Sequence, residues 1–151
     1  MQILCRLSPI DGPNWLVRSK VLGLAIRPLL EAQVLNDMLY LSLHKDVKPL
    51  YTSGVRYEEE PHWTFQGEPV EEFATVPVVL KRGWGDCDDL APWRCAELRL
   101  RHRENAKIRI QWQRQQLPNG QLGRKYFHIV VRRADGSIED PSLKLGMGAP
   151  R

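Results

Sequence analysis

The stretch Gly83-Trp84-Gly85-Asp86-Cys87-Asp88-Asp89-Leu90-Ala91-Pro92-Trp93-Arg94 decides how the rest of the chain is interpreted. Its two glycines free the backbone, its aspartates suit a helix start, and the residues that follow predict a helix to about Arg103. Cys87 therefore stands at the N-terminal end of a predicted helix. There the helix dipole and the unpaired N–H groups favour the thiolate and lower the pKa of the thiol. Cys87 is thus a candidate nucleophile.

The composition is that of an ordinary globular protein. With 151 residues, 42% of them hydrophobic and 26% charged, we expect one domain spanning residues 1–151. The net charge of +4 is mild, and the arginines are not interleaved with aromatic residues at regular spacing. We therefore expect solvated faces rather than a nucleic-acid surface. No run approaches the roughly 20 apolar residues of a membrane span, and residues 1–6 lack the features of a signal peptide.

The cysteine pattern predicts free thiols. Cys5, Cys87 and Cys95 are odd in number and widely spaced, which gives no disulfide framework and fits a cytoplasmic site of action. A metal site built from Cys87, Cys95 and His102 is disfavoured, because there is no CxxC pair and the spacings do not converge on one face. We expect no metal and no cofactor.

Hydrophobic periodicity predicts an α+β protein in which helices come first and an antiparallel meander follows. The helical pattern runs over 15–44 and is best over 28–43, with Pro28 in the first turn of that part. The remaining expected elements are strands at 2–7, 55–57, 107–113, 125–132 and 137–140, one helical turn in 68–73, a short buried segment or helical turn at 76–80, and a hairpin turn at 118–120.

A cysteine nucleophile needs a base, and the base needs a group that orients it. Only one of the four histidines, His128, stands in mid-strand between apolar residues, where it is either a satisfied core residue or a positioned base. Asp140 follows one hairpin later. A three-residue loop, Ala134-Asp135-Gly136, would pair Asp140 with Val130 and place it on the face of His128, whereas a two-residue loop would place it on the opposite face.

Three segments in this order resemble the transglutaminase-like superfamily. They are Gly85-Asp86-Cys87-Asp88-Asp89-Leu90-Ala91, Tyr126-Phe127-His128-Ile129-Val130-Val131 and Asp135-Gly136-Ser137-Ile138-Glu139-Asp140-Pro141-Ser142. The chain is most similar to bacterial transglutaminase-like cysteine proteinases and to small phage-encoded proteins of that type. The segment from Tyr51 to Pro61 also resembles the phage group.

The resemblance implies a papain-like fold, in which a cysteine-bearing helix packs on a C-terminal antiparallel sheet that carries His and Asp. It implies Cys87 as the nucleophile, His128 as the general base and acid, and Asp140 as the orienting group. The reaction would run through a thioester acyl-enzyme, with water giving amide hydrolysis and an amine giving transamidation. The candidates for the oxyanion donors are the Cys87 N–H with Trp63 or Gln66, and the candidates for substrate contacts are Trp84 and Asp86.

The resemblance leaves three functions open. The first is a cysteine peptidase or amidase acting on a protein or peptide substrate. The second is a transglutaminase-type crosslinker, and the third is a phage structural or assembly factor that uses the same scaffold and binds virion or assembly proteins. Each would act in the bacterial or phage-infected host cytoplasm, with virion association for the third. The sequence departs from what the resemblance implies for an active enzyme in two ways. Pro92 follows soon after the nucleophile and cannot donate a backbone hydrogen bond, so we expect the helix to begin near Asp88 or Asp89. The negative charges of the nearby carboxylates oppose a thiolate at Cys87.

Overall fold

The structure is a computed structural model of the 151-residue chain. It describes the backbone of residues 2–6, 15–60, 63–65, 68–116, 120 and 122–148. It describes the side chains of residues 26–60, 72–112, 120 and 127–148.

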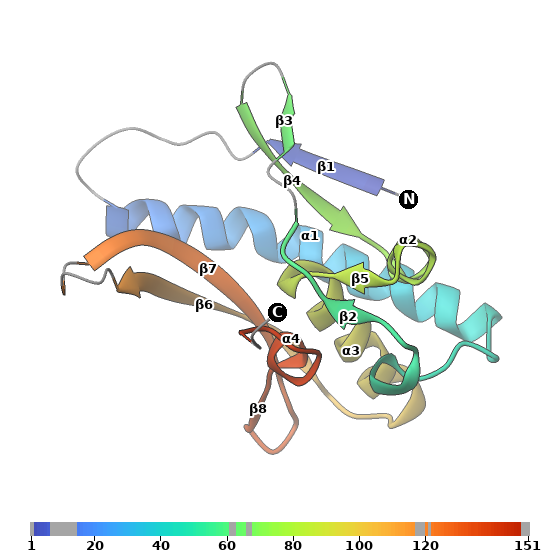
Figure 1. Cartoon of the computed structure of the whole chain (residues 1–151). Coiled ribbons are helices and arrows are strands. Elements are labelled where there is room, and N and C mark those ends of the chain that lie inside the picture. Colours follow the sequence, from blue (N-terminus) through green and yellow to red (C-terminus); the bar gives the residue numbers. More distant parts are fainter. Residues whose placement is uncertain are drawn as a thin grey trace.

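The chain is an α+β protein in which helices and small sheets alternate (Figure 1). The elements are, in order, β1 (Gln2–Arg6), α1 (Trp15–Leu43), the 3₁₀ turn η1 (Leu50–Thr52), β2 (Arg56–Tyr57), β3 (Trp63–Phe65), β4 (Glu68–Ala74), α2 (Val76–Arg82), β5 (Trp84–Gly85), α3 (Cys87–Arg101), β6 (Lys107–Gln116), β7 (Leu122–Arg132), β8 (Ile138–Glu139) and α4 (Pro141–Lys144).

The strands of the described chain form three small sheets. Two are antiparallel, with the strand orders β1-β4-β3 and β6-β7-β8, and the third is a parallel pair of β2 and β5. The sheet β6-β7-β8 is the expected C-terminal meander. The hairpin turn expected at 118–120 falls between β6 and β7, and of its three residues only Gly120 is described.

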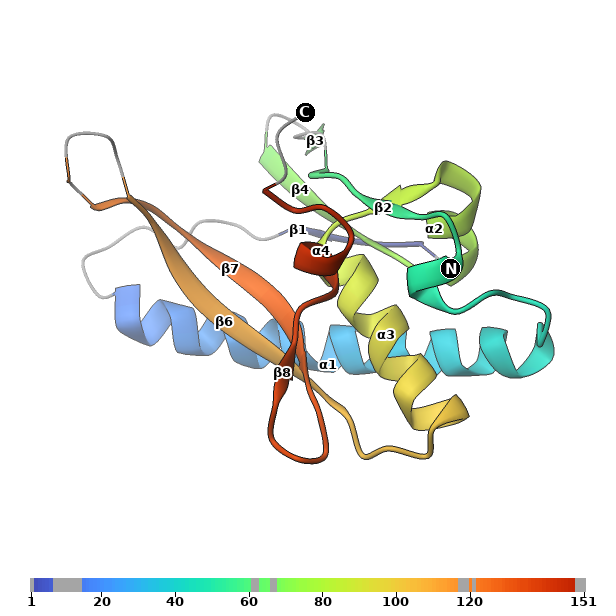
Figure 2. The same cartoon turned by 60° about the horizontal axis from the view of Figure 1, so that its bottom comes forward.

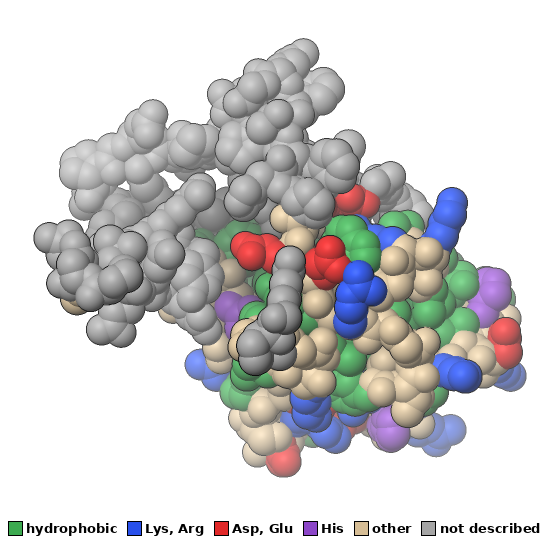
Figure 3. Space-filling view, viewed as in Figure 1, with side chains coloured by type: hydrophobic (Ala, Val, Ile, Leu, Met, Phe, Trp, Pro, Cys, Tyr) green, Lys and Arg blue, Asp and Glu red, His purple; other side chains and the backbone are tan. Residues whose placement is uncertain are grey.

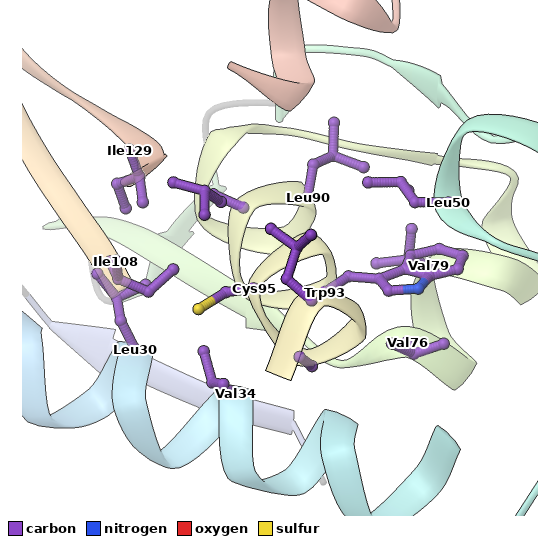
Figure 4. Close-up of a cluster of buried hydrophobic side chains, with 14 of the residues drawn as sticks. Leu30, Val34, Leu50, Val76, Val79, Leu90, Trp93, Cys95, Ile108 and Ile129 are labelled. Carbon is purple, nitrogen blue, oxygen red and sulfur yellow. The ribbon is translucent and has the colours of Figure 1, made fainter. Parts of the chain in front are cut away.

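Helix α3 occupies the centre of the core. Its buried side chains, among them Leu90, Trp93 and Cys95, face α1 on one side and β7 on another (Figure 4). Helix α1 contributes its inner face, which includes Leu30 and Val34. Figure 2 shows α3 crossing α1 at a steep angle, with α4 beside the end of α3 where Cys87 stands. The helix that carries the candidate nucleophile is therefore held by packing along its whole length.

Two expectations from the sequence are wrong. Helix α1 runs without a break from Trp15 to Leu43, so Pro28 lies in its interior rather than in a first turn. Pro28 is exposed, and the inner face of the helix stays buried on both sides of it. Residues 68–73, expected as a helical turn, belong to strand β4, because β4 pairs along its length with β1 and also with β3.

The hairpin between β7 and β8 has the register predicted for a three-residue loop. Val131 pairs with Glu139, and the Arg133 N–H donates to the Ser137 carbonyl at 2.8 Å. Residues 134–136 therefore form the loop, which Gly136 closes at a φ of 88°, in the left-handed region that glycine adopts without strain. Continuing this register pairs Asp140 with Val130, on the face of His128.

A buried carboxyl joins α1 to the start of α2. Asp37 is fully buried, and its Oδ1 accepts a hydrogen bond from the Val76 N–H at 2.9 Å. Its Oδ2 has no hydrogen-bond partner. Burial raises the pKa of Asp37 to about 7, although the Val76 hydrogen bond lowers it.

Asp37→Asn is expected to stabilise the protein above neutral pH. The folded chain keeps a proton on Asp37 that the unfolded chain releases above pH 3.8, so the stabilising contribution is complete below that pH and is lost as pH rises to about 7. Asparagine keeps the acceptor for Val76 and carries no charge. We expect a gain of about 1–4 kcal/mol in the free energy of unfolding at pH 8 and little change at pH 4, measured by urea denaturation. An equal difference at both pH values would contradict this prediction.

Candidate active site

Cys87 is the first residue of α3 and is partly buried. Asp86 caps the helix in a capping box with Asp89, whose Oδ2 accepts the Asp86 N–H at 3.3 Å. The sequence predicted a cysteine at a helix start, and this is confirmed. The helix begins one residue earlier than Pro92 led us to expect, so Pro92 lies in its second turn. There it cannot donate a backbone hydrogen bond to the Asp88 carbonyl.

His128 and Asp140 form a hydrogen-bonded pair. His128 lies in mid-β7 with 5% of its surface exposed, and its Nε2 lies 2.7 Å from Asp140 Oδ2. The other carboxylate oxygen of Asp140 accepts the Leu143 N–H at 3.1 Å and caps α4. Because Nε2 is held by Asp140, Nδ1 is the ring nitrogen left for a thiol.

The structure brings the element that carries Cys87 against those that carry the His128–Asp140 pair. Helix α3 contacts both β7 and α4. Cys87 and Phe127, the neighbour of His128, pack against the same hydrophobic cluster. The His128–Asp140 pair therefore lies on elements that pack beside the helix of Cys87.

Three carboxyl groups gather around the nucleophile. The ligand oxygens of Asp86, Asp88 and Asp89 lie within 4.8 Å of one another, and all three residues are buried. Asp89 is balanced by an ion pair with Arg82 and by the Ala74 N–H at 2.6 Å. Carboxylate oxygens are ligands of hard cations such as Ca²⁺, so these three residues could hold one.

Asp88 has the least favourable environment of the three. It is fully buried, and neither of its oxygens accepts a hydrogen bond from an N–H or hydroxyl donor. Burial raises its pKa well above the ordinary value, and the neighbouring charges of Asp86, Asp89 and Cys87 add to the rise. The protonated acid, which can donate to Asp86, is therefore favoured. A neutral Asp88 opposes the Cys87 thiolate less than an ionised one would.

Tyr57 lies beside the nucleophile and was missed in the sequence. Strand β2 pairs with β5 so that Tyr57 stands opposite Gly85, two residues before Cys87. Its N–H donates to the Leu145 carbonyl at 2.9 Å. Burial raises the pKa of the Tyr57 hydroxyl, and the charges of Cys87 and Asp86 raise it further. The hydroxyl therefore stays protonated near the thiol; no local pattern in the sequence marks it.

A second network, also missed in the sequence, fixes the residue that precedes Asp140. Glu139 is 5% exposed and accepts hydrogen bonds from Tyr51 at 2.5 Å, Arg94 at 2.7 Å and Arg133 at 3.0 Å, with Lys144 at 3.3 Å. Burial alone would raise the pKa of Glu139, but the hydrogen bonds from Tyr51 and Arg94 and the nearby cations lower it to about 2. Arg94 belongs to α3, so Glu139 ties the helix of Cys87 to strand β8.

The remaining predicted site residues are the substrate-contact candidates Trp84 and Asp86 and the oxyanion candidates Trp63 and Gln66. Trp84 is partly buried, with the Arg82 guanidinium 3.8 Å from its ring centroid, and Arg82 Nε donates to its carbonyl at 2.8 Å. Asp86 is 8% exposed and serves as the helix cap. Trp63 lies in β3, but its side chain is outside the described part, and Gln66 is outside it altogether. The oxyanion and substrate roles of these residues stay predictions.

On the face that Figure 3 shows, the Lys and Arg side chains of the described residues are scattered and form no single stripe. Several arginines take part in ion pairs with carboxylates, including Arg99 with Glu31 and Arg133 with Glu104. Among the described residues, no helix has the length and apolar character needed to cross a membrane.

Comparisons of the chain with protein-family models, curated proteins and solved structures give no match.

Proposed function

We propose that this protein is a cysteine-dependent amide hydrolase, a peptidase or amidase of transglutaminase-like type on a papain-like scaffold. The observation that supports it best is the 2.7 Å hydrogen bond between His128 and Asp140, on elements packed against the helix that begins with Cys87. A buried histidine oriented by a carboxylate is the base that a thiol nucleophile requires. The packing of α3 on an antiparallel sheet also supports a papain-like arrangement.

In the proposed reaction, His128 Nδ1 takes the proton of the Cys87 thiol and the sulfur attacks the carbonyl carbon of the amide. The oxyanion of the tetrahedral intermediate accepts a hydrogen bond from the Cys87 N–H at the start of α3. The imidazolium then gives its proton to the leaving amine, the C–N bond breaks and a thioester remains. Water, deprotonated by His128, attacks the thioester, and the carboxylic acid and the thiol are released. Asp140 holds the imidazole through Nε2 and stabilises its positive charge.

The experiment that tests this proposal is a peptide-library digestion followed by mass spectrometry. Wild-type protein and a Cys95→Ala control, which alters a buried thiol of α3 with a pKa raised by burial to about 12, are expected to give the same products. Cys87→Ala is expected to give none. Added hydroxylamine should capture the thioester as a hydroxamate, and a labelled primary amine distinguishes transamidation from hydrolysis. Absence of products and of any Cys87 adduct would contradict catalysis and leave the assembly-factor function.

A further inference from the structure

Strand β2 runs beside the segment that leads into the nucleophile. Tyr57 pairs with Gly85 in parallel, and the Glu58 N–H donates to the Gly85 carbonyl at 3.1 Å. Continuing this parallel register by two residues sets Glu59 beside Cys87, the first residue of α3. An acidic residue far away in the sequence therefore comes next to the candidate nucleophile.

Glu59 and Asp86 place two carboxyl groups close to the thiol. Burial raises the pKa of the Tyr57 hydroxyl most, and the charges of Cys87, Asp86 and Glu59 raise it further. The thiol and both carboxyl groups thus lie around one hydroxyl, in agreement with the strand register. Glu59 is exposed and Asp86 is 8% exposed, so one of the two acids stands at the surface and the other beneath it.

Neither of these two acids is balanced by a cation of the described residues. Glu59 and Asp86 form no ion pair there, whereas other carboxylates hold the cations of the elements around the start of α3. These ion pairs are Arg56 of β2 with Glu58 at 2.7 Å, Arg82 of α2 with Asp89, and Lys144 of α4 with Glu139 at 3.3 Å. The surroundings of Cys87 therefore keep a negative charge that a ligand can balance.

Asp86 also offers an acceptor that the protein leaves unused. Its side chain caps α3, but its Oδ1 atom is buried and receives no hydrogen bond from an N–H or hydroxyl group of the described residues. Buried acceptors in folded proteins normally have a donor partner. An ammonium or guanidinium group would supply both the missing donor and the positive charge.

We propose that Glu59 and Asp86 form a subsite that selects a substrate with a Lys or Arg side chain next to the scissile amide bond. The inference rests on the cysteine hydrolase function proposed above, and it names Glu59 as a residue that determines specificity. A site lined by one sign of charge raises the local concentration of substrates of opposite charge and rejects those of like charge. The subsite therefore favours basic peptides over acidic ones.

Charged thiol reagents test the subsite without any turnover. Cys87 is labelled either with the cationic trimethylammonioethyl methanethiosulfonate or with the anionic sulfonatoethyl methanethiosulfonate, and peptide mass spectrometry gives the two rates. Glu59→Gln is expected to lower the ratio of the cationic to the anionic rate about fivefold at low ionic strength, and less in high salt. An unchanged ratio, or a Cys87 that neither reagent reaches, would overturn the subsite.

Asp46→Asn is the matched control for this labelling experiment. It also removes one exposed carboxyl group, but Asp46 lies beside Val47, whose carbonyl accepts a hydrogen bond from Arg101 in the last turn of α3. Cys87 stands at the opposite end of this helix, about 20 Å away, which is beyond the Debye length at physiological salt. The ratio of the two rates should therefore change less than about twofold in this variant.

Peptide-library digestion tests the substrate class. The wild type is expected to cleave peptides with Lys or Arg beside the scissile bond about tenfold or more faster than the same peptides with Glu there, and Glu59→Lys should reverse this order. Products without a charge preference would overturn the subsite and leave the hydrolase function standing. Absence of any product would contradict the hydrolase function and the substrate class together, while the reagent ratio still reports the charge around Cys87.

Discussion

His128→Ala is expected to slow the alkylation of Cys87 by iodoacetamide roughly 30-fold at pH 7. A free thiol with a pKa of about 8.5 is only about 3% ionised at that pH, whereas a cysteine paired with an imidazolium is mostly thiolate. The carboxylate of the neighbouring Asp86 opposes the thiolate, so little besides the helix start would favour it once the imidazole is gone. The rate is measured by peptide mass spectrometry of the labelled protein.

Two further variants make the result specific. His102→Ala removes the exposed histidine that follows α3 and should leave the Cys87 labelling rate unchanged. Asp140→Asn replaces the carboxylate that holds His128 Nε2 and should slow labelling by less than His128→Ala, because the imidazole remains. Equal labelling rates for the wild type and His128→Ala would show that Cys87 and His128 do not form a catalytic pair.

Glu139→Ala is expected to lower the free energy of unfolding by about 3–5 kcal/mol. Glu139 is buried among Tyr51, Arg94, Arg133 and Lys144, and its removal leaves partly buried cations without their shared anion. Urea denaturation at pH 7 measures the loss. The exposed pair of Arg56 and Glu58 provides the control: Glu58→Ala should cost about 1 kcal/mol or less.

The effect of Glu139 should depend on pH in the acid range. Its pKa falls from 4.5 in the unfolded chain to about 2 in the folded chain, so its stabilising contribution is present above pH 4.5 and is lost as pH falls through about 2. The difference between wild type and Glu139→Ala should therefore shrink as the pH is lowered from 5. A loss at pH 7 no larger than that of Glu58→Ala would contradict the role of Glu139 as the anion that joins α3 to β8.

The parts of the fold that could be predicted from sequence are those set by local signals. The cap at Asp86 fixes the start of α3, and the glycine at 136 fixes the loop that puts Asp140 on the face of His128. Strand β4 could not be predicted, because its conformation depends on pairing with β1, more than sixty residues earlier. The continuity of α1 through Pro28 likewise depends on burial against α3, which no local pattern reports.

The same division holds for the candidate site. Local sequence signals indicate the three residues proposed for catalysis. Cys87 stands at a predicted helix start, His128 in an apolar strand, and Asp140 after a hairpin of defined length. No local signal indicates Tyr57 or Glu139, because their positions come from contacts between distant segments; Tyr51 and Glu139, for example, are 88 positions apart. Sequence reasoning therefore reached the residues proposed for the chemistry and missed those that hold and surround them.

The pH dependence of Cys87 alkylation tests the proposed Cys87–His128 pairing most directly. Labelling of the wild type between pH 4 and 10, with Cys95 as the internal reference for a buried thiol, gives the midpoint at which Cys87 ionises. Pairing with His128 predicts a midpoint at least one unit below the value of about 8.5 for a free thiol, and its return to that value or above in His128→Ala. A midpoint at or above about 8.5 in the wild type, unchanged in the variant, would contradict the proposed catalytic triad.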